Sequence, residues 1–117
     1  MKESKTSTLR IYVGNTDKVN SAPLYETIVY AAKNRGMAGA TVLKGVMGYG
    51  ANSVVHSSKI FAISDDLPMV IEIVDTDEKI SSFIDVIQPY LENPKFGMLI
   101  TKQSVDVIHY SLSKTNN

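Results

Sequence analysis

Apolar and polar residues alternate along several short stretches of this chain, a pattern typical of strands with one buried face. Residues 9–13 show the alternation most simply, and residues 41–46 are rich in β-branched side chains. A third strand is predicted over residues 59–63, interrupted at 65–68 and resumed over 69–74. A fourth strand is predicted over 98–101 and a short last one over 105–110. The polar ends are predicted to form a disordered tail over 1–8 and a polar tail over 111–117, which leaves one domain over 9–110.

Two other stretches repeat apolar residues at helical spacing. The first follows Pro23, which suits the first turn of a helix, and is predicted to stop at Gly36. The second begins at the acidic residues of 75–78, which suit a helix amino terminus. Its apolar stripe consists of Ile80, Phe83, Ile84, Ile87 and Leu91. Pro89 lies inside this stripe, so a kink or an early end is predicted there.

The order of these elements is strand, helix, strand, strand, helix, strand. It predicts an α+β protein with the ferredoxin-like βαββαβ two-layer sandwich and a short extra C-terminal strand. Right-handed crossovers place both helices on one face of the sheet. The strands over 41–46 and 69–74 carry apolar residues on alternate positions of both faces. We therefore expect an oligomer to cover the second face.

Composition narrows the classes of function. The 117 residues contain no cysteine, which excludes disulfides, cysteine-ligated zinc and thiol catalysis. Twelve basic residues balance twelve acidic ones, so no bulk attraction to nucleic acid is expected. The polar start lacks the apolar core of a signal peptide, and the apolar runs are strand-sized. We expect a cytoplasmic protein that is not membrane-inserted.

Residues 45–57, the glycine-rich loop, carry the most specific pattern. Gly45, Gly48 and Gly50 read G-x-x-G-x-G, which reverses the dinucleotide fingerprint, and no helix pattern follows. The Gly-Lys-Ser/Thr ending of a Walker loop is also missing. Two interpretations stay open: glycines that let backbone N–H groups approach an anion, or a bulged hairpin that needs positive φ.

Six segments give the chain a resemblance to an uncharacterised bacterial family of PII-like proteins, number 190 among the domains of unknown function. They lie at 9–14 (Leu-Arg-Ile-Tyr-Val-Gly), 23–26, 36–42, 45–50, 66–75 and 105–110. The resemblance implies a ferredoxin-like fold and a homotrimer like that of the PII signalling proteins.

The likeness to PII proteins themselves is carried by two segments. Residues 45–50 are similar to the glycine-rich start of the PII T-loop, and residues 67–74 to the strand after it. PII proteins sense ATP, ADP and 2-oxoglutarate, and their T-loop contacts the regulated partner. The chain departs from them in its phosphate segment, where 93–98 replace Gly-Asp-Gly-Lys, and in its last strand, where His109 and Ser111 replace an arginine pair. The T-loop tyrosine that PII proteins modify has no counterpart.

Candidate site residues cluster on the glycine-rich loop. A small anionic ligand, with an adenine nucleotide as one candidate, is expected to contact two groups of residues. Those on or next to the loop are Lys44, Gly48, Tyr49, Gly50, Ser53 and His56, with Lys95 and Gly97 closing the cleft from a facing loop. Tyr49 is the best candidate for stacking on a base. His56 has no cluster of further ligands around it in the sequence, so no metal site is predicted.

Glu72 is the one charge in an apolar strand, and it is predicted to face a subunit interface or to pair with Lys44 or Lys59. The carboxylates at 65–66 and 75–78 lie at turns and a helix start, where acidic residues are expected for structural reasons. No nucleophile with a base and an orienting group is recognisable, so no catalytic residues are predicted.

The leading hypothesis is a homotrimeric PII-like regulatory protein that binds its ligand between subunits and signals through the glycine-rich loop. The alternative is a ligand-free interaction module that docks on a partner such as a membrane transporter. A third hypothesis is an enzyme on a small anionic substrate, with His56 as base.

Overall fold

The computed structural model describes residues 5–49, 56–57 and 67–113. Its main elements are β1 (Thr6–Gly14), α1 (Leu24–Asn34), β4 (Thr41–Lys44), β7 (Pro68–Thr76), α2 (Asp77–Leu91) and β8 (Leu99–Ser104). Four further strands have only two residues each: β2 (Lys18–Val19), β3 (Ala22–Pro23), β5 (Met47–Gly48) and β6 (His56–Ser57). The order of the main elements is βαββαβ, which confirms the predicted ferredoxin-like class.

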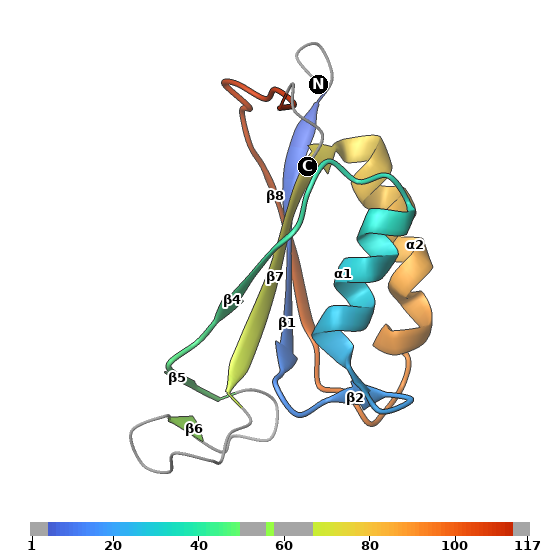
Figure 1. The fold of residues 1–117 in the computed structure, drawn as a ribbon, viewed down its shortest axis with the longest axis vertical. Coiled ribbons are helices and arrows are strands. Elements are labelled where there is room, and N and C mark those ends of the chain that lie inside the picture. Colours follow the sequence, from blue (N-terminus) through green and yellow to red (C-terminus); the bar gives the residue numbers. More distant parts are fainter. Residues whose placement is uncertain (1–4, 50–55, 58–66, 114–117) are drawn as a thin grey trace.

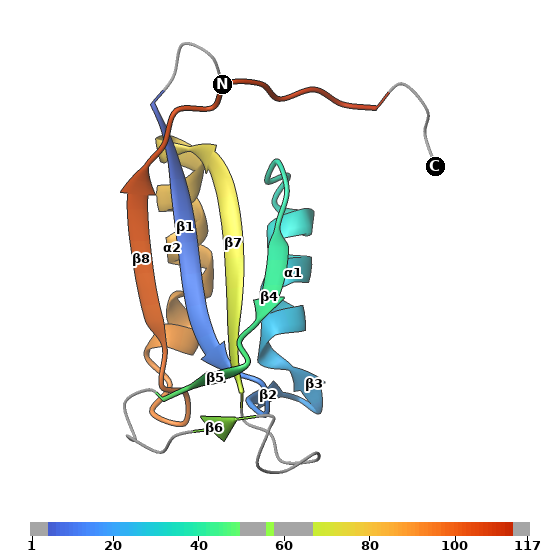
Figure 2. The same cartoon turned by 90° about the vertical axis from the view of Figure 1, so that its left-hand side faces the viewer.

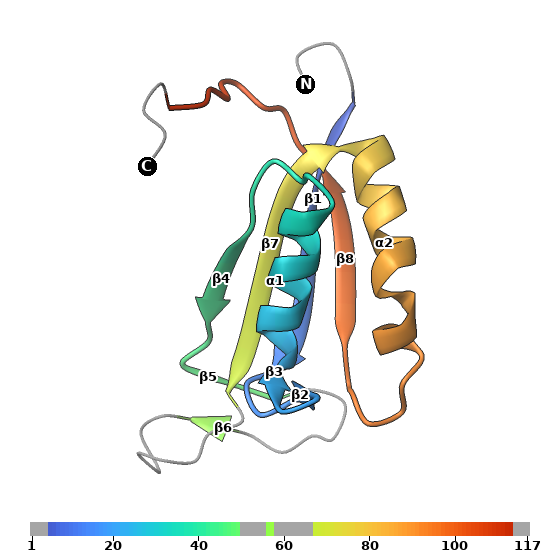
Figure 3. The same cartoon turned by 45° about the vertical axis from the view of Figure 1, so that its right-hand side comes forward.

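The four long strands form one antiparallel sheet in the order β4-β7-β1-β8. β1 lies at the centre and pairs with β7 from Thr6↔Thr76 to Gly14↔Pro68, while β4 and β8 form the two edges. Both helices of the described residues lie on the same side of this sheet, as Figures 1 and 3 show. The opposite side, which we call the open face, carries neither helix (Figure 1).

The core lies between the sheet and the helices. Strand residues on alternate positions point into it, so Leu9, Ile11 and Val13 of β1 are buried beside Met69, Ile71 and Ile73 of β7. Each fully buried side chain of this size stabilises the fold by about 1.5–3 kcal/mol. The stripe predicted for the second helix supplies the other half: Ile80, Phe83 and Ile87 are buried, and Ile84 and Leu91 pack at the margin.

The helix ends follow the predicted chemistry with small shifts. Pro23 occupies the N-cap position of α1, one residue before the helix, and Gly36 follows its C-cap at φ +71°. Thr76 caps α2 and accepts a hydrogen bond from the N–H of Lys79 at 3.2 Å. α2 continues to Leu91, so Pro89 does not end it early.

Several predicted boundaries are wrong. β1 begins at Thr6, so residues 6–8 belong to the sheet and not to a disordered tail. β4 ends at Lys44 instead of 46, and residues 105–110 are not part of a strand, although the N–H of Val105 donates to the carbonyl oxygen of Thr6 at 3.1 Å. The β2–β3 hairpin was not predicted; its turn places Asn20 and Ser21 at positive φ. The strand predicted over 59–63 lies outside the described residues.

Candidate functional site

The glycine-rich loop starts and returns at one end of the sheet. β5 pairs with β6 in antiparallel register, Met47 opposite Ser57 and Gly48 opposite His56, so the base of the loop is a hairpin. The β5–β6 hairpin follows β4 in the chain and lies at the end of the domain where β7 begins (Figures 1 and 2). The described base of the loop therefore lies beside the edge of the sheet that β4 forms.

Two of the loop glycines are needed because Pro68 lies against them. The N–H of Gly45 donates to the carbonyl oxygen of Pro68 at 2.7 Å. A Cβ added at Gly45 would lie 2.6 Å from Pro68 Cγ and 3.2 Å from its carbonyl oxygen, and one at Gly48 would lie 3.0 Å from Pro68 Cγ. Neither glycine has positive φ, so of the two interpretations left open the one that needs positive φ does not apply to them, and the close approach of Pro68 is the steric constraint at both.

The structure describes part of the predicted ligand set. Lys44 is exposed at the end of β4, Gly48 is half-buried, and Tyr49 is 71% exposed beside it. Gly50 and Ser53 lie outside the described residues, and only the backbone of His56 is described. Of the predicted set near the loop, the structure thus describes Lys44 at the end of β4, Gly48 in β5 and Tyr49 directly after it.

Lys95 and Gly97 lie in the connection between α2 and β8, where both are exposed. This connection is at the same end of the domain as the glycine-rich loop, but on the helix side, whereas β5 and β6 lie on the open-face side (Figure 1). Within one chain the two groups are not brought together. A cleft that uses both needs a second copy of the chain.

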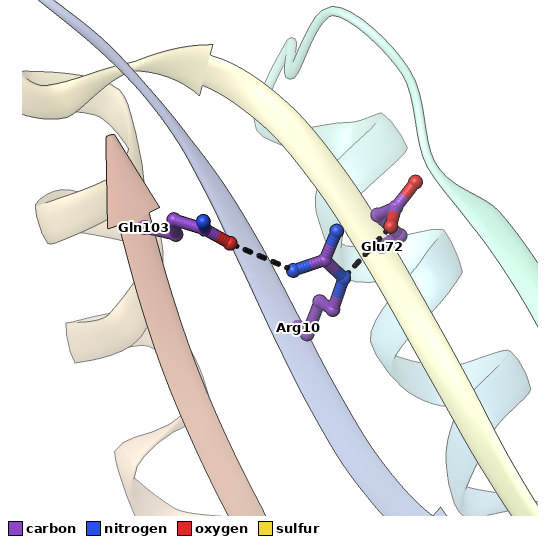
Figure 4. A network of polar contacts seen from close by, with 3 residues as sticks. All are labelled: Arg10, Glu72 and Gln103. Atoms are coloured by element: carbon purple, nitrogen blue, oxygen red, sulfur yellow. Dashed lines mark hydrogen bonds and ion pairs between the residues drawn. The ribbon is translucent and has the colours of Figure 1, made fainter. Parts of the chain in front are cut away.

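Polar side chains form a network at the centre of the open face (Figure 4). Arg10 Nε lies 2.9 Å from Glu72 Oε2, and Arg10 Nη1 donates to Gln103 Oε1 at 3.3 Å. Glu72 was predicted to pair with Lys44 or Lys59; its partner is Arg10, the residue opposite it in the β1–β7 ladder. Their side chains are about one-third exposed in the single chain, 35% and 32%.

A row of larger side chains, all apolar apart from the hydroxyl of Tyr12, lies next to this network on the open face. Tyr12, Val70 and Leu99 occupy neighbouring strands in register, and Leu43 lies opposite Val70 on the edge strand β4. Leu43 and Leu99 are 51% and 57% exposed. The open face thus combines the apolar area that the alternation of residues predicts with an Arg10–Glu72 ion pair that was not predicted.

The carboxylates at the start of α2 have structural partners. Asp75 is 2% exposed, and its two oxygens accept hydrogen bonds from the N–H groups of Ala38, at 2.8 Å, and Thr76, at 2.7 Å. Asp77 accepts from the hydroxyl of Ser7 and lies 3.5 Å from Lys102 Nζ. The hydrogen bond from Ser7, followed by the charge of Lys102, lowers the pKa of Asp77 below its ordinary value.

Two searches of the described residues bear on the class of site. Within the described ranges, no group of three or more histidine or acidic side chains is placed to hold a metal ion. In the same part of the chain, no helix has the length and apolar character needed to cross a membrane.

Comparison with solved structures identifies proteins of similar fold. The chain matches CPII, a nitrogen regulatory PII-like protein from Thiomonas intermedia K12, in a structure bound to ADP, AMP and bicarbonate. The TM-score is 0.61 at 16% identity, over 88% of this chain and 90% of that one. A second CPII structure, bound to ADP and bicarbonate, gives a TM-score of 0.60 at the same identity. The fold is therefore that of PII-like proteins.

Comparison with sequences places the family. A UPF0166 protein of Aquifex aeolicus is 35% identical over 93% of this chain and 99% of its own length. A UPF0166 protein of Methanocaldococcus jannaschii is 36% identical over 76% of this chain and 82% of its own length. The model of family DUF190, described as "Uncharacterized ACR", matches residues 6–107. The chain belongs to the DUF190 family, as the six segments of its sequence predict.

Proposed function

We propose that this protein is a homotrimeric PII-like regulator that binds a small anionic ligand between subunits, with an adenine nucleotide as the first candidate. The observation that supports the proposal is the PII-like sheet with a glycine-rich loop at one edge, where Lys44 ends β4, Gly48 lies in β5 and Tyr49 is 71% exposed. A cation, a close backbone and an exposed aromatic ring suit the phosphate and base of a nucleotide.

Two further observations support a site between subunits. The second group of candidate residues, Lys95 and Gly97, lies across the domain from the first, so two copies are needed to combine them. The open face offers the apolar area for such an assembly. The CPII structures of similar fold hold ADP and AMP, which makes these nucleotides the first ligands to test.

Binding is expected to change the order of the glycine-rich loop and so to display the ligand state to a partner. This regulatory role involves no catalytic residue. The alternative is a ligand-free module in which the loop alone docks on a partner such as a membrane transporter, and nucleotide binding separates the two.

The test is a thermal-shift and calorimetric titration of the whole protein with ADP, AMP and ATP, with its mass measured in the same buffer. A nucleotide at 100 times its Kd is expected to stabilise the fold by about 2.7 kcal/mol, a shift of several degrees in Tm. Lys44→Ala is expected to weaken nucleotide binding at least ~10-fold, since a charged hydrogen bond is lost.

The matched control is Lys33→Ala, which removes an equally exposed cation from the last turn of α1. Its affinity for the nucleotide should equal that of the wild type. A trimer that no nucleotide stabilises would contradict the ligand proposal and favour the ligand-free module. A monomer would contradict a site between subunits.

A further inference from the structure

The β2–β3 hairpin carries backbone strain at an exposed turn. Asn20 and Ser21 lie at φ +50° and +73°, in the left-handed region that favours glycine. Asparagine tolerates this region better than most residues, whereas Ser21 stands where such a turn commonly has glycine. Both residues are exposed. Strain that is kept at an exposed turn points to a use for the side chain that causes it.

The fold itself does not use these two side chains. Within the described ranges, neither the amide of Asn20 nor the hydroxyl of Ser21 makes a hydrogen bond. Lys18, two residues before Asn20, is also exposed and forms no ion pair in that part of the chain. The tip of the hairpin therefore presents a cation, an amide and a hydroxyl to whatever lies outside the chain.

The hairpin is held firmly at its base. The Oδ2 atom of Asp17 accepts a hydrogen bond from the N–H of Gly14 at 3.0 Å, and the carbonyl oxygen of Asp17 accepts one from the N–H of Leu24 at 2.7 Å. Val19 packs against the core. A ligand at the tip would meet groups that are already fixed in place, which lowers the entropic cost of binding.

The hairpin lies at the end of the domain that carries the candidate site. Figures 1 and 3 show β2 and β3 below α1, at the same end and on the same side of the sheet as the connection between α2 and β8. That connection holds Lys95 and Gly97, and the N–H of Lys95 donates to Asn93 Oδ1 at 2.9 Å. The hairpin therefore belongs to the half of the proposed cleft that these two residues form.

The arginines of the chain lie elsewhere, although arginine is well suited to hold phosphate groups. Arg10 is engaged with Glu72 on the open face, 2.9 Å from its carboxylate. Arg35 is the C-cap of α1, at the end of that helix away from the glycine-rich loop (Figure 1). Phosphate groups bound at the candidate site would thus depend on lysines and on uncharged donors.

The lysines of the proposed site leave part of the phosphate charge unpaired. Lys44 and Lys95 together carry less positive charge than the phosphates of ADP or ATP carry negative charge. Lys18 is a further exposed lysine at this end of the domain. The acid beside it in the sequence, Asp17, is turned to the N–H of Gly14 and is used by the fold.

We propose that the tip of the β2–β3 hairpin is a phosphate-binding element of the nucleotide site, in which Lys18 and the hydroxyl of Ser21 contact the phosphates beside Lys95. Charged hydrogen bonds to phosphate are among the strong ones. Serine in place of glycine at the strained position then has a reason, because glycine offers no hydroxyl to a phosphate oxygen. The proposal rests on the proposed function and adds residues that would hold the phosphates.

Two substitutions of Ser21 separate the hydroxyl from the strain. Ser21→Ala keeps the Cβ, so the Tm without nucleotide should not rise, while the affinity for ADP should fall at least ~10-fold with the lost hydrogen bond. Ser21→Gly should raise the Tm without nucleotide, because glycine accepts positive φ, and should weaken ADP binding equally. A higher Tm in Ser21→Gly with wild-type affinity for ADP in both variants would mean that the turn is structural only, and would overturn the proposal.

Lys18→Ala tests the charge by calorimetric titration with ADP. The affinity is expected to fall at least ~10-fold, with no change in Tm in the absence of nucleotide. Lys33→Ala, an exposed lysine in the last turn of α1, is again the control and should bind ADP as the wild type does. Wild-type affinity in both Lys18→Ala and Ser21→Ala would overturn the role of the hairpin and leave the proposed function standing. A wild-type protein that binds neither ADP, AMP nor ATP would overturn both.

Discussion

At the scale of single residues, the carboxylates around Thr76 hold the chain in place. Asp75 ties the segment before β4 to β7 through the N–H of Ala38, and Asp77 ties the start of α2 to β1 through Ser7. Asp75 accepts hydrogen bonds from two backbone N–H groups, and Asp77 accepts one from the hydroxyl of Ser7. These contacts give both carboxylates a structural role, as their position at a helix start predicts.

The hydrogen bond from Ser7 predicts how Asp77 titrates. Because the folded state lowers the pKa of Asp77, the unfolded state binds more protons at acid pH. The stabilisation is complete above the unfolded pKa of about 3.9 and is lost as the pH falls through the lower, folded pKa. In Ser7→Ala the pKa of Asp77 should move back toward its ordinary value, and the loss of stability in acid should become shallower.

An NMR titration of the Asp77 carboxyl carbon in both proteins measures this shift. Ser82→Ala, an exposed serine of α2, is the control and should titrate as the wild type does. An unchanged Asp77 titration in Ser7→Ala would show that the charge of Lys102 lowers the pKa instead.

The cross-strand partner of Glu72 was harder to predict than the face of the sheet on which Glu72 lies. Alternation along β7 is enough to place Glu72 on the face opposite the core, as observed. Its partner depends on which strand lies beside β7 and in which register, and those are properties of the whole sheet. Arg10 stands opposite Glu72 only because β1 inserts between β7 and β8.

At the scale of elements, the join between β4 and β5 is set by contact with Pro68. Replacing Gly45 by alanine would bring a Cβ to 2.6 Å from Pro68 Cγ and 3.2 Å from the carbonyl oxygen that Gly45 bonds. We expect Gly45→Ala to lower the free energy of unfolding by about 1–3 kcal/mol, because the backbone must move apart. Chemical denaturation measures the change.

Gly39→Ala is the matched control, since nothing lies within 4 Å of its added Cβ and its φ is not positive. It should be neutral or slightly stabilising. Combining Gly45→Ala with Pro68→Ala should recover part of the loss, because most of the clash involves the proline ring. Equal effects at Gly45 and Gly39 would contradict the contact as the cause.

The elements themselves were predictable wherever their pattern is local. The helical stripe from Ile80 to Leu91 and the alternation in β1 and β7 need only periodicity, and all three elements were predicted. The β2–β3 hairpin escaped prediction because each of its strands has only two residues, too few to show a period. The roles of Gly45 and Gly48 also escaped, since the residue that approaches them lies twenty positions or more along the chain.

At the scale of the whole molecule, the open face and residues 105–113, which follow β8, both expose large apolar side chains in the single chain. Leu43 and Leu99 of the open face are 51% and 57% exposed, and Ile108 and Leu112 are 86% and 80% exposed. In the trimer that we propose, a copy docked in the wrong orientation on the open face would leave Arg10 and Glu72 buried against apolar atoms. We therefore expect this ion pair to set orientation and the apolar residues beside it to supply affinity.

Leu99 offers a test of the open face that leaves residues 105–113 untouched. It lies opposite Tyr12 in the β1–β8 ladder and is 57% exposed in the single chain. If the proposed trimer assembles through the open face, Leu99→Asp should fold as the wild type does but be monomeric, because assembly would bury the new carboxylate without a partner. Tyr30→Asp, on the exposed side of α1 at 61% exposure, removes a larger apolar side chain away from the open face and should keep the trimer. Sedimentation velocity gives the mass of each variant, and circular dichroism shows that each is folded. A folded Leu99→Asp protein with the mass of the wild-type trimer would mean that the subunits assemble through another surface.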